Sequence, residues 1–384
     1  MGAAWRACLT GASRCLRTGC VESAPFYFPW FELPDKRTMK SKLLPKILAS
    51  QLIFAASATG AFAQVSYSIT DLGTLNTFAG SSFNVGYALA INNSGQIAAN
   101  ATASGFGSPL GNSINDSGQT VQGDFLYTGG TPTALGYLPG GDTTGASGIN
   151  SSGQVVGSAN TGRGTPNQAF LYSGNTMTAL GQGSAIAINN NGQVVGFTAI
   201  NRNLPNHAFL YTSGTMLDLG TLGGSVSYAT AINNSGQVVG LSDTSGNLAD
   251  HAFLYSGGAM IDLGTLPGTS ISEAHGINDS GQIVGYTETP TGSGGFLPYH
   301  AFIDSAGIMT DLNSLIPANS DWDLINAEGI NNSGQIVGYG TDPSGLTEAF
   351  LLTPTPEPST VALCVAGSAM LLLSRRISRQ PTTP

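Results

Sequence analysis

Three histidines could do metal chemistry because they recur at one position of a repeated pattern. His207, His251 and His300 each precede an Ala-Phe pair, and three imidazoles can bind zinc. The equivalent positions elsewhere hold Gln168 and Glu348, which share only hydrogen bonding with histidine. We therefore expect these histidines to make hydrogen bonds within their own repeats and not to form one metal site.

Aspartates recur in the same way. They end segments of the Asp-Leu-Gly or Asp-Leu-Asn type, at Asp71, Asp218, Asp262 and Asp311. Short acidic side chains commonly accept hydrogen bonds from backbone N–H groups two residues further on, so we expect these four aspartates to cap turns.

A different constellation stands at Asp321, Trp322 and Asp323, where a neighbouring repeat has Val-Ser-Tyr. Trp322 is the only tryptophan within residues 64–354. An indole flanked by carboxylates could stack on a sugar ring and bond its hydroxyls, which makes this a candidate sugar-binding site. The alternative is that Trp322 fills space between repeats.

Other chemistry finds no support in the sequence. It contains no serine elbow, phosphate-binding loop or Cys/His cluster, and each Asn-Asp-Ser-Gly turn offers one carboxylate where calcium needs several oxygen ligands. We expect no cofactor, no metal and no enzymatic activity. The alternative is an extracellular carbohydrate-active hydrolase or lyase, which would need two carboxylates about 5–9 Å apart.

The elements that would position these residues are best read from residues 231–266. Asn233-Asn234-Ser235-Gly236 predicts a type I turn followed by a left-handed glycine, with the first asparagine bonded to its own backbone. Residues 237–240 then return as a second strand, with a bulge predicted at Gly240. Residues 251–255 and 260–263 form the third and fourth strands, and the third is apolar on both faces, as in a strand covered on both sides.

This unit recurs along the chain. Seven turns of the same type follow one another, with their glutamines 23, 35, 39, 44, 45 and 53 residues apart. Repeats of about 40 residues with four strands each are typical of propeller blades. We predict an all-β fold, a β-propeller of six or seven four-stranded blades, with a β-solenoid as the alternative. The number depends on whether residues 86–109 form a degenerate blade or an insertion.

The two ends of the repeat region complement each other. Residues 67–75 resemble a fourth strand without its first three, and residues 348–352 a third strand without its fourth. Pairing of these two strands would close the ring and remove open sheet edges. The half-unit offset is what favours the propeller over the solenoid.

The combination of His-Ala-Phe, Ile-Asn-Asn-Ser-Gly-Gln and Asp-Leu-Gly-Thr-Leu segments resembles the extracellular HAF repeats of bacteria. The resemblance covers roughly Tyr67 to Leu352 and implies an exported protein. It implies nothing about a ligand.

The first 63 residues stand apart from the repeats. Residues 1–38 lack usable periodicity, and we interpret them as a mis-assigned start or an unstructured extension. Residues 39–63 have the three parts of a secretory signal peptide: lysines, an apolar core, and a cleavage site at Ala61 and Ala63. The repeat domain is expected to span residues 64–353.

Charge limits the partners of that domain. Residues 64–354 contain two cationic side chains, Arg163 and Arg202, and no lysine, against eighteen carboxylates. Such an acidic surface repels nucleic acid and anionic membranes. We expect no nucleic-acid partner.

The last 31 residues carry a sorting signal. Pro356, Glu357 and Pro358 precede an apolar segment at residues 360–374, and Arg375 and Arg376 follow it. In this order the three parts resemble the PEP-CTERM signal of residues 354–379, which leaves residues 380–384 as a cytoplasmic end.

That resemblance implies cleavage by an exosortase-type protease after transient anchoring in the inner membrane. It also implies delivery to the cell surface or exopolysaccharide matrix of a Gram-negative bacterium. We therefore expect a non-enzymatic binding or structural module of that surface or matrix, with exopolysaccharide as a candidate partner.

Overall fold

The computed structural model describes residues 65–73, 87–100, 113–198, 206–289 and 299–355. All of them belong to one compact unit, Ala63–Pro384, separate from Met1–Phe62. The predicted signal peptide with Ala61 and Ala63, and the sorting signal with Pro356, Glu357, Pro358, Arg375 and Arg376, lie outside the described residues. Among the residues that are described, no helix is long and apolar enough to cross a membrane.

The described part of the chain is all-β, as predicted, apart from one short 3-10 helix, η1 (Leu312–Ser314). Every paired strand runs antiparallel to its neighbours within a sheet. The repeat read from the sequence forms one four-stranded sheet: β15 (Gly223–Ile232), β16 (Val238–Thr244), β17 (Asp250–Ser256) and β18 (Ala259–Asp262).

Two further sheets have this four-stranded order, and the described residues of another form a two-stranded sheet. They comprise β2 (Tyr87–Ile91) and β3 (Ile97–Asn100); β4 (Ser113–Ile114), β5 (Thr120–Gln122), β6 (Phe125–Thr128) and β7 (Thr131–Ala134); and β19 (Ile271–Ile277), β20 (Ile283–Glu288), β21 (His300–Ser305) and β22 (Ile308–Asp311). A seven-stranded sheet contains β8 (Thr144–Ile149), β9 (Val155–Ala159), β10 (Gln168–Ser173), β11 (Thr176–Ile188), β12 (Val194–Thr198), β13 (Ala208–Thr212) and β14 (Thr215–Asp218). Its long strand β11 serves two units, because its first half pairs with β10 and its second half with β12.

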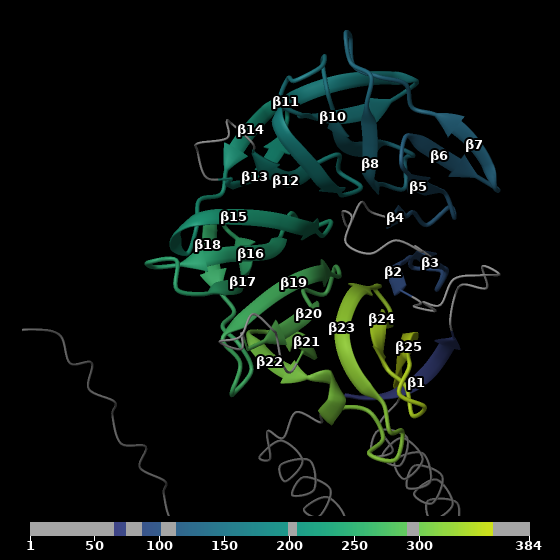
Figure 1. The fold of residues 1–384 in the computed structure, drawn as a ribbon, viewed down its shortest axis with the longest axis vertical. Coiled ribbons are helices and arrows are strands. Elements are labelled where there is room, and N and C mark those ends of the chain that lie inside the picture. The colour runs from purple at the N-terminus through teal and green to yellow at the C-terminus, as the bar shows by residue number, and fades with distance from the viewer. Residues whose placement is uncertain (1–64, 74–86, 101–112, 199–205, 290–298, 356–384) are drawn as a thin grey trace, which may run out of the picture. The chain divides into compact units, whose positions relative to one another are not determined.

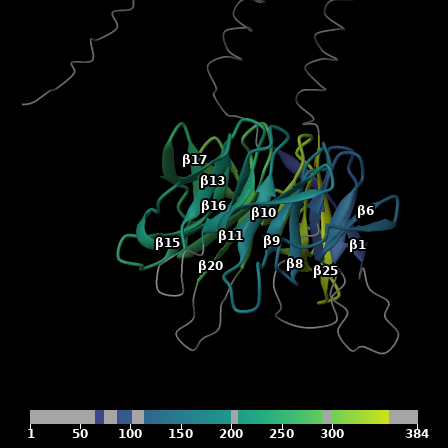
Figure 2. The ribbon, with the colours of Figure 1, turned by 90° about the horizontal axis from the view of Figure 1, so that it is seen from above.

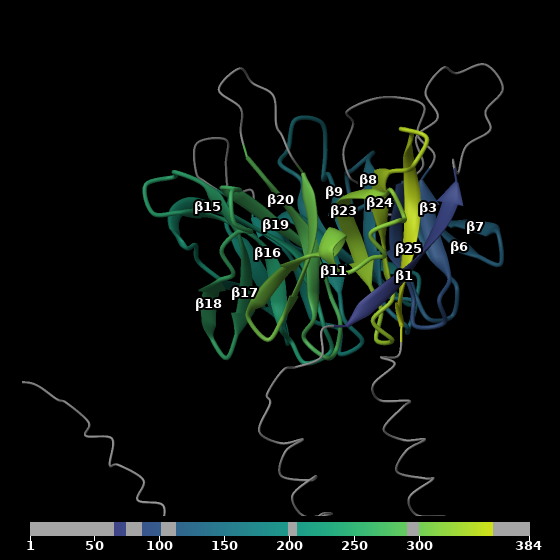
Figure 3. The same cartoon turned by 90° about the horizontal axis from the view of Figure 1, so that it is seen from below.

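The two ends of the repeat region share a sheet, as their complementary patterns predicted. β1 (Ser66–Gly73) pairs with β25 (Thr347–Thr355), which continues to β24 (Ile336–Thr341) and β23 (Asp323–Ile330). Tyr67 of β1 is 2% exposed, and its backbone N–H donates to the Leu315 carbonyl at 2.8 Å. Figure 3 shows β1 lying beside β25. The first strand therefore takes the place of a fourth strand after β25.

The predicted turn is confirmed in detail. In the turn at Asn233 the N–H of Gly236 donates to the Asn233 carbonyl at 3.1 Å, and Gly236 has a φ of 77°. The Asn233 side-chain oxygen accepts from the N–H groups of Ser235 and Gln237 at 3.1 and 3.0 Å. Asparagine thus supplies the acceptors that the turn needs, and glycine the left-handed conformation.

The first asparagine of every turn also reaches the next turn. Its Nδ2 donates to the backbone oxygen of the next first asparagine at 2.9–3.1 Å, in a cycle that returns to its start: Asn92, Asn115, Asn150, Asn189, Asn233, Asn278, Asn331 and again Asn92. In Figure 1 the sheets succeed one another in chain order about the centre where these turns meet. The segment that could have been an insertion therefore contributes a turn equivalent to the other six.

One local prediction was wrong. The bulge is not at Gly240 but on the opposite strand, where the register of β15 shifts between Ala229 and Ala231, so that Thr230 is the extra residue. Gly240 pairs directly with Ala229, and a Cβ there would collide with the Tyr228 carbonyl oxygen. The glycine is needed for close approach of two backbones, while the bulge turns Thr230 out of the ladder.

The core lies between the sheets. Phe170, Phe209, Phe253, Phe302 and Phe350 come from the third strands of successive units and are fully buried. Clusters of buried residues join each unit to the next; in one of them Val195 of β12 and Ala208 of β13 pack with Phe253 of β17. Figure 2 shows the sheets on edge, standing side by side. The double-sided burial predicted for the third strand follows from this packing.

Candidate functional site

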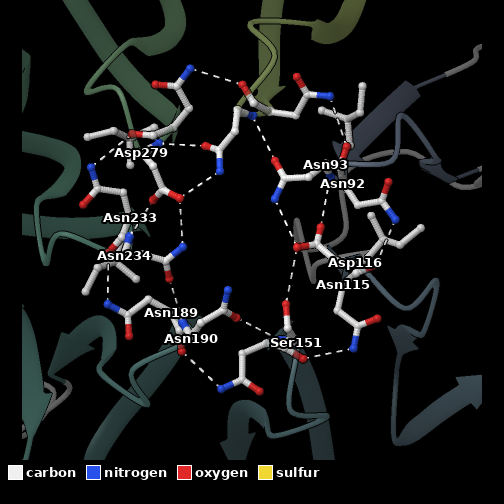
Figure 4. A pocket seen from close by; sticks show the side chains of 18 of the residues that line it. Asn92, Asn93, Asn115, Asp116, Ser151, Asn189, Asn190, Asn233, Asn234 and Asp279 are labelled. Atoms are coloured by element: carbon white, nitrogen blue, oxygen red, sulfur yellow. Dashed lines mark hydrogen bonds between the residues drawn. The ribbon is translucent and has the colours of Figure 1, made fainter.

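The seven turns surround a polar mouth. The second residue of each turn lines it: Asn93, Asp116, Ser151, Asn190, Asn234, Asp279 and Asn332. Most of them accept a backbone N–H from a neighbouring turn; Asp279, for example, accepts that of Asn234 at 2.8 Å (Figure 4). Asp116 and Ser151 are linked only by a 3.5 Å contact between the serine hydroxyl and the carboxylate. The mouth encloses about 170 Å³.

Hydrogen bonds stabilise the charged form of Asp279 at the mouth. Burial opposes ionisation of Asp279, but hydrogen bonds from Asn234 and Asn332 outweigh it and keep the pKa of this carboxyl below its usual value. The polar atoms at the rim are largely hydrogen-bonded to one another. The mouth therefore serves mainly to link the seven turns and offers few free polar atoms to a ligand.

A wider channel lies behind the mouth. It has a volume of about 710 Å³ and is lined by the first strands of all seven repeats, within the range typical of small-ligand sites. Seven isoleucines line both the mouth and the channel: Ile91, Ile114, Ile149, Ile188, Ile232, Ile277 and Ile330. This apolar ring separates the polar mouth from the channel.

The bulge residues face the channel. The register shift seen at Thr230 recurs in five other first strands, beside Leu89, Ser147, Ile186, His275 and Glu328. All six residues line the channel. Bulges commonly re-aim a side chain, and here they turn one residue of each first strand inward.

Two of these inward residues are charged and lie together. His275 Nε2 is 3.5 Å from Glu273 Oε1, and His275 Nδ1 is 3.1 Å from Glu328 Oε2. The second contact lacks hydrogen-bond alignment, so it is an ion pair. Burial opposes charge on the imidazole, but the two glutamates outweigh it and raise the pKa of His275 to about 10. The imidazole is therefore held as a cation between two carboxylates.

Further side chains support this cluster. The Tyr286 hydroxyl donates to Glu273 Oε2 at 3.0 Å, and Asn326 Nδ2 donates to Glu328 Oε1 at 2.9 Å. Burial and the charge of Glu273 raise the pKa of Tyr286, so its hydroxyl stays a donor. Burial opposes the charge of Glu273, but His275 and Tyr286 outweigh it and lower the pKa of this carboxyl.

Aromatic rings continue the wall beside the charges. Phe197 and Tyr228 meet edge to face with ring centroids 4.9 Å apart, and both line the channel. Asn206 Nδ2 donates to the Tyr228 hydroxyl at 3.0 Å and holds the ring in place. The polar cluster and the aromatic pair are contributed by neighbouring repeats, so the channel has one chemically distinct side.

The sequence did contain a signal for this cluster, which our motif-based reading missed. The position three residues before the first asparagine holds Leu89, Ser147, Ile186 and Thr230 in other repeats but His275 and Glu328 in the last two. This position is uncharged in the other repeats, so the change to histidine and glutamate in the last two is a departure from the repeat pattern. The functional interpretation of this change depends on the bulge, which turns the side chain at this position toward the channel.

The histidines singled out from the sequence behave as predicted. The Nδ1 atoms of His207, His251 and His300 lie 2.9–3.1 Å from the carboxylates of Asp218, Asp262 and Asp311 respectively. Each pair joins the fourth strand of a unit to its third strand or, for His207, to the residue just before the third strand. Each of the three histidines is therefore paired with an aspartate of its own repeat.

The aspartates also cap turns as predicted. Asp71, Asp218 and Asp262 accept the backbone N–H two residues ahead at 2.7–2.8 Å, and Asp311 accepts that of Asn313 at 2.8 Å. In the part of the chain that the structure describes, the side chains that converge closely enough for a metal are Asp71, Asp342 and Glu348. This acidic cluster does not include the histidines.

The candidate sugar site stays a prediction. Trp322 is half-buried and packs edge to face on Phe350, with centroids 6.3 Å apart, while Asp321 and Asp323 are exposed. The packing agrees with the space-filling alternative and leaves the sugar-stacking hypothesis untested.

Comparisons with known proteins give a limited picture. No protein-family model and no curated protein matches the chain. Among solved structures, TolB from Acinetobacter baumannii is similar at 11% identity and a TM-score of 0.36, over 72% of this chain and 65% of that one. A putative TolB from Agrobacterium tumefaciens (12%, 0.40, 71% and 91%) and a protein of unknown function from Dyadobacter fermentans (11%, 0.38, 75% and 99%) are also similar. The chain thus spans just under two thirds of the length of the first.

Proposed function

We propose that this protein is an exported, non-enzymatic binding module of the bacterial surface or exopolysaccharide matrix, built as a seven-bladed β-propeller. The cycle of seven hydrogen-bonded turns supports the blade number, since it passes through every repeat once and returns to Asn92. The pairing of β1 with β25 supports closure of the last blade by the first strand.

Export and processing rest on the sequence signals at the two ends. The mature protein should begin near Gln64 and end close to Glu357, because the arginines beyond the apolar segment resist transfer through the bilayer and leave Pro356 to Pro358 outside. Intact-mass measurement of protein recovered from the host's surface tests this. A mass that includes residues 361–384 would reduce the tail to a plain membrane anchor.

The observation that carries the binding role is the Glu273–His275–Glu328 cluster facing a channel of about 710 Å³. Burying charge costs free energy, so a repeat that served only as a scaffold would be expected to keep uncharged residues at the positions that face the channel. We therefore place the ligand in the channel, on the side of His275 and Tyr228.

A bulky side chain in the channel should weaken ligand binding strongly. Ser147 lies across from the cluster and is 7% exposed, so Ser147→Trp would project an indole into the channel. In a panel of neutral, amino and acidic glycans we expect this variant to lose at least about tenfold in affinity for whichever glycan the purified protein binds. The control is Thr133→Trp on β7, where every side chain is exposed.

Equal binding by Ser147→Trp and the intact protein would move the site elsewhere, with Asp321, Trp322 and Asp323 as the next candidate. The enzyme alternative gains one observation, since two carboxylates flank His275 within 3.5 Å. A histidine whose pKa is raised to about 10 is a poor general base. Release of new reducing ends from the same panel, lost in Glu328→Gln, would favour the hydrolase or lyase.

A further inference from the structure

The donors of the channel cluster are directed at groups within it, although His275 Nδ1 meets Glu328 only as an ion pair and makes no aligned hydrogen bond. Both ring nitrogens of His275 face carboxylates, the Tyr286 hydroxyl donates to Glu273, and Asn326 Nδ2 donates to Glu328. A carboxylate offers about four acceptor positions on its two oxygens, so each glutamate keeps acceptor capacity. What the cluster can still offer a ligand is acceptors.

A buried amide oxygen reinforces this imbalance. Asn326 is 4% exposed, and its Oδ1 has no hydrogen-bond partner, although its Nδ2 is bonded to Glu328. Asn326 is not among the residues that line the channel, so this oxygen adds to the acceptors around Glu328 without itself facing a ligand.

The charge of the site points the same way. Two glutamates face one imidazolium, and among the described residues that line the channel there is no lysine or arginine. The field of Glu273 extends to Asp250, whose pKa is raised to about 6 by burial, by its bond to Asp243 and by that charge. Within the described lining the cation that an anionic ligand could meet is His275, and two carboxylates already flank it.

The aromatic pair supplies the remaining surface. Phe197 and Tyr228 line the channel next to the repeat that holds the cluster. Aromatic faces accept both apolar CH groups and cations. An amino sugar combines these properties: hydroxyl and ammonium donors on its edges and CH groups on its faces.

We propose that the channel binds an amino sugar or a short oligomer of one, with its ammonium against Glu273 and Glu328, and that it rejects uronic acids. This inference rests on the proposed function, because it presupposes that the channel is a binding site. The proposal predicts that the protein binds amine-bearing glycans more tightly than acidic polysaccharides.

Calorimetric titration of the purified protein with three matched trimers tests the proposal: glucosamine, N-acetylglucosamine and galacturonic acid. We expect the glucosamine trimer to bind at least about tenfold more tightly than the acetylated trimer, and no binding of the uronate. Glu328→Gln should abolish the difference between the first two. Asp142→Asn, an exposed carboxylate paired with Arg163, is the control and should leave it unchanged.

The outcomes separate the two proposals. If neither the trimers nor any glycan of the wider panel binds, the channel function itself fails; if another glycan of that panel binds but no trimer does, only the ligand class is wrong. If the uronate binds as tightly as the amine, the ligand class is wrong while the channel function stands. If Glu328→Gln keeps the preference for the amine, the ligand class is also wrong, because the preference then reflects the acidic surface as a whole. Should Glu328→Gln not fold, Glu273→Gln and the loss of amine preference at high salt provide the same test.

Discussion

A chain without residues 65–73 is expected to unfold at least about 10 °C below the intact protein, since a domain of this size loses roughly 2–4 °C for each kcal/mol. The deletion removes seven paired positions between β1 and β25 and the fully packed ring of Tyr67. Burial of one such side chain is worth about 1.5–3 kcal/mol. It also opens an edge beside Phe350 and Leu352, both fully buried in the intact chain.

The matched control keeps the strand but moves it. In the β17–β18 hairpin, Gly257 and Gly258 join a third strand to a fourth. Ser66 lies opposite Thr355, with their hydroxyls 2.7 Å apart, so a Gly-Gly linker could join them in the same way. A circular permutant that carries residues 65–73 after Thr355 should melt close to the intact protein. Thermal unfolding of both proteins decides the matter: a deletion that melts within a degree or two of the parent would overturn closure by β1.

The sequence predicted those features of the fold that each repeat encodes locally. The turn at Asn233 needs an acceptor side chain followed by a left-handed glycine, and both are visible in four consecutive residues. The pairing of β1 with β25 was predictable because each end lacks what the other has. The equivalence of the turns at Asn92 and Asn115 was not predictable, since they are only 23 residues apart. In the structure the two turns are linked by the same Asn-to-carbonyl hydrogen bond that links the other turns, at 2.9 Å.

The channel cluster was missed for a physical reason. Alternation along a regular strand assigns Thr230 and its counterparts to one face of the sheet, and the bulge changes that assignment. Our sequence reading placed the bulge at Gly240, which left His275 and Glu328 without a common destination. Gly240 instead permits the close approach of two strands. The β-bulges in the first strands therefore determine which side chains face the channel, and the sequence of a single repeat does not reveal where the bulge lies.

Asn233→Ala is expected to destabilise the protein by about 2–4 kcal/mol, because buried groups that lose their partners cost roughly 1–3 kcal/mol each. The Asn233 side chain is 3% exposed and makes four hydrogen bonds. Two are accepted from the turn that it begins, one is donated to Gln237, and one is donated to the carbonyl of Asn278 in the next repeat. Alanine leaves all four partners without it.

The neighbouring residue is the control, since Asn234 lies in the same turn but is exposed. Its side chain accepts from Asn190 and donates to Asp279 at the surface, where water can replace either bond. Asn234→Ala should therefore cost well under about 1.5 kcal/mol, the upper end for an ordinary hydrogen bond. Chemical denaturation of the two variants compares them directly, and equal losses would show that the cycle of asparagines contributes no more than a surface contact.

An isosteric change separates the donors from the acceptors of Asn233. Asn233→Asp keeps the oxygen that accepts from Ser235 and Gln237, but it replaces Nδ2 with a second oxygen facing the Asn278 carbonyl. At neutral pH that oxygen carries charge beside an acceptor in a buried site, so the variant should be at least as unstable as Asn233→Ala. Burial would raise the folded-state pKa of the new carboxyl above its unfolded value, so its penalty should shrink as pH falls toward that unfolded value. If Asn233→Asp is instead as stable as the parent at pH 7, the link between successive turns does not hold the ring together, and packing of the phenylalanines between sheets must do so alone.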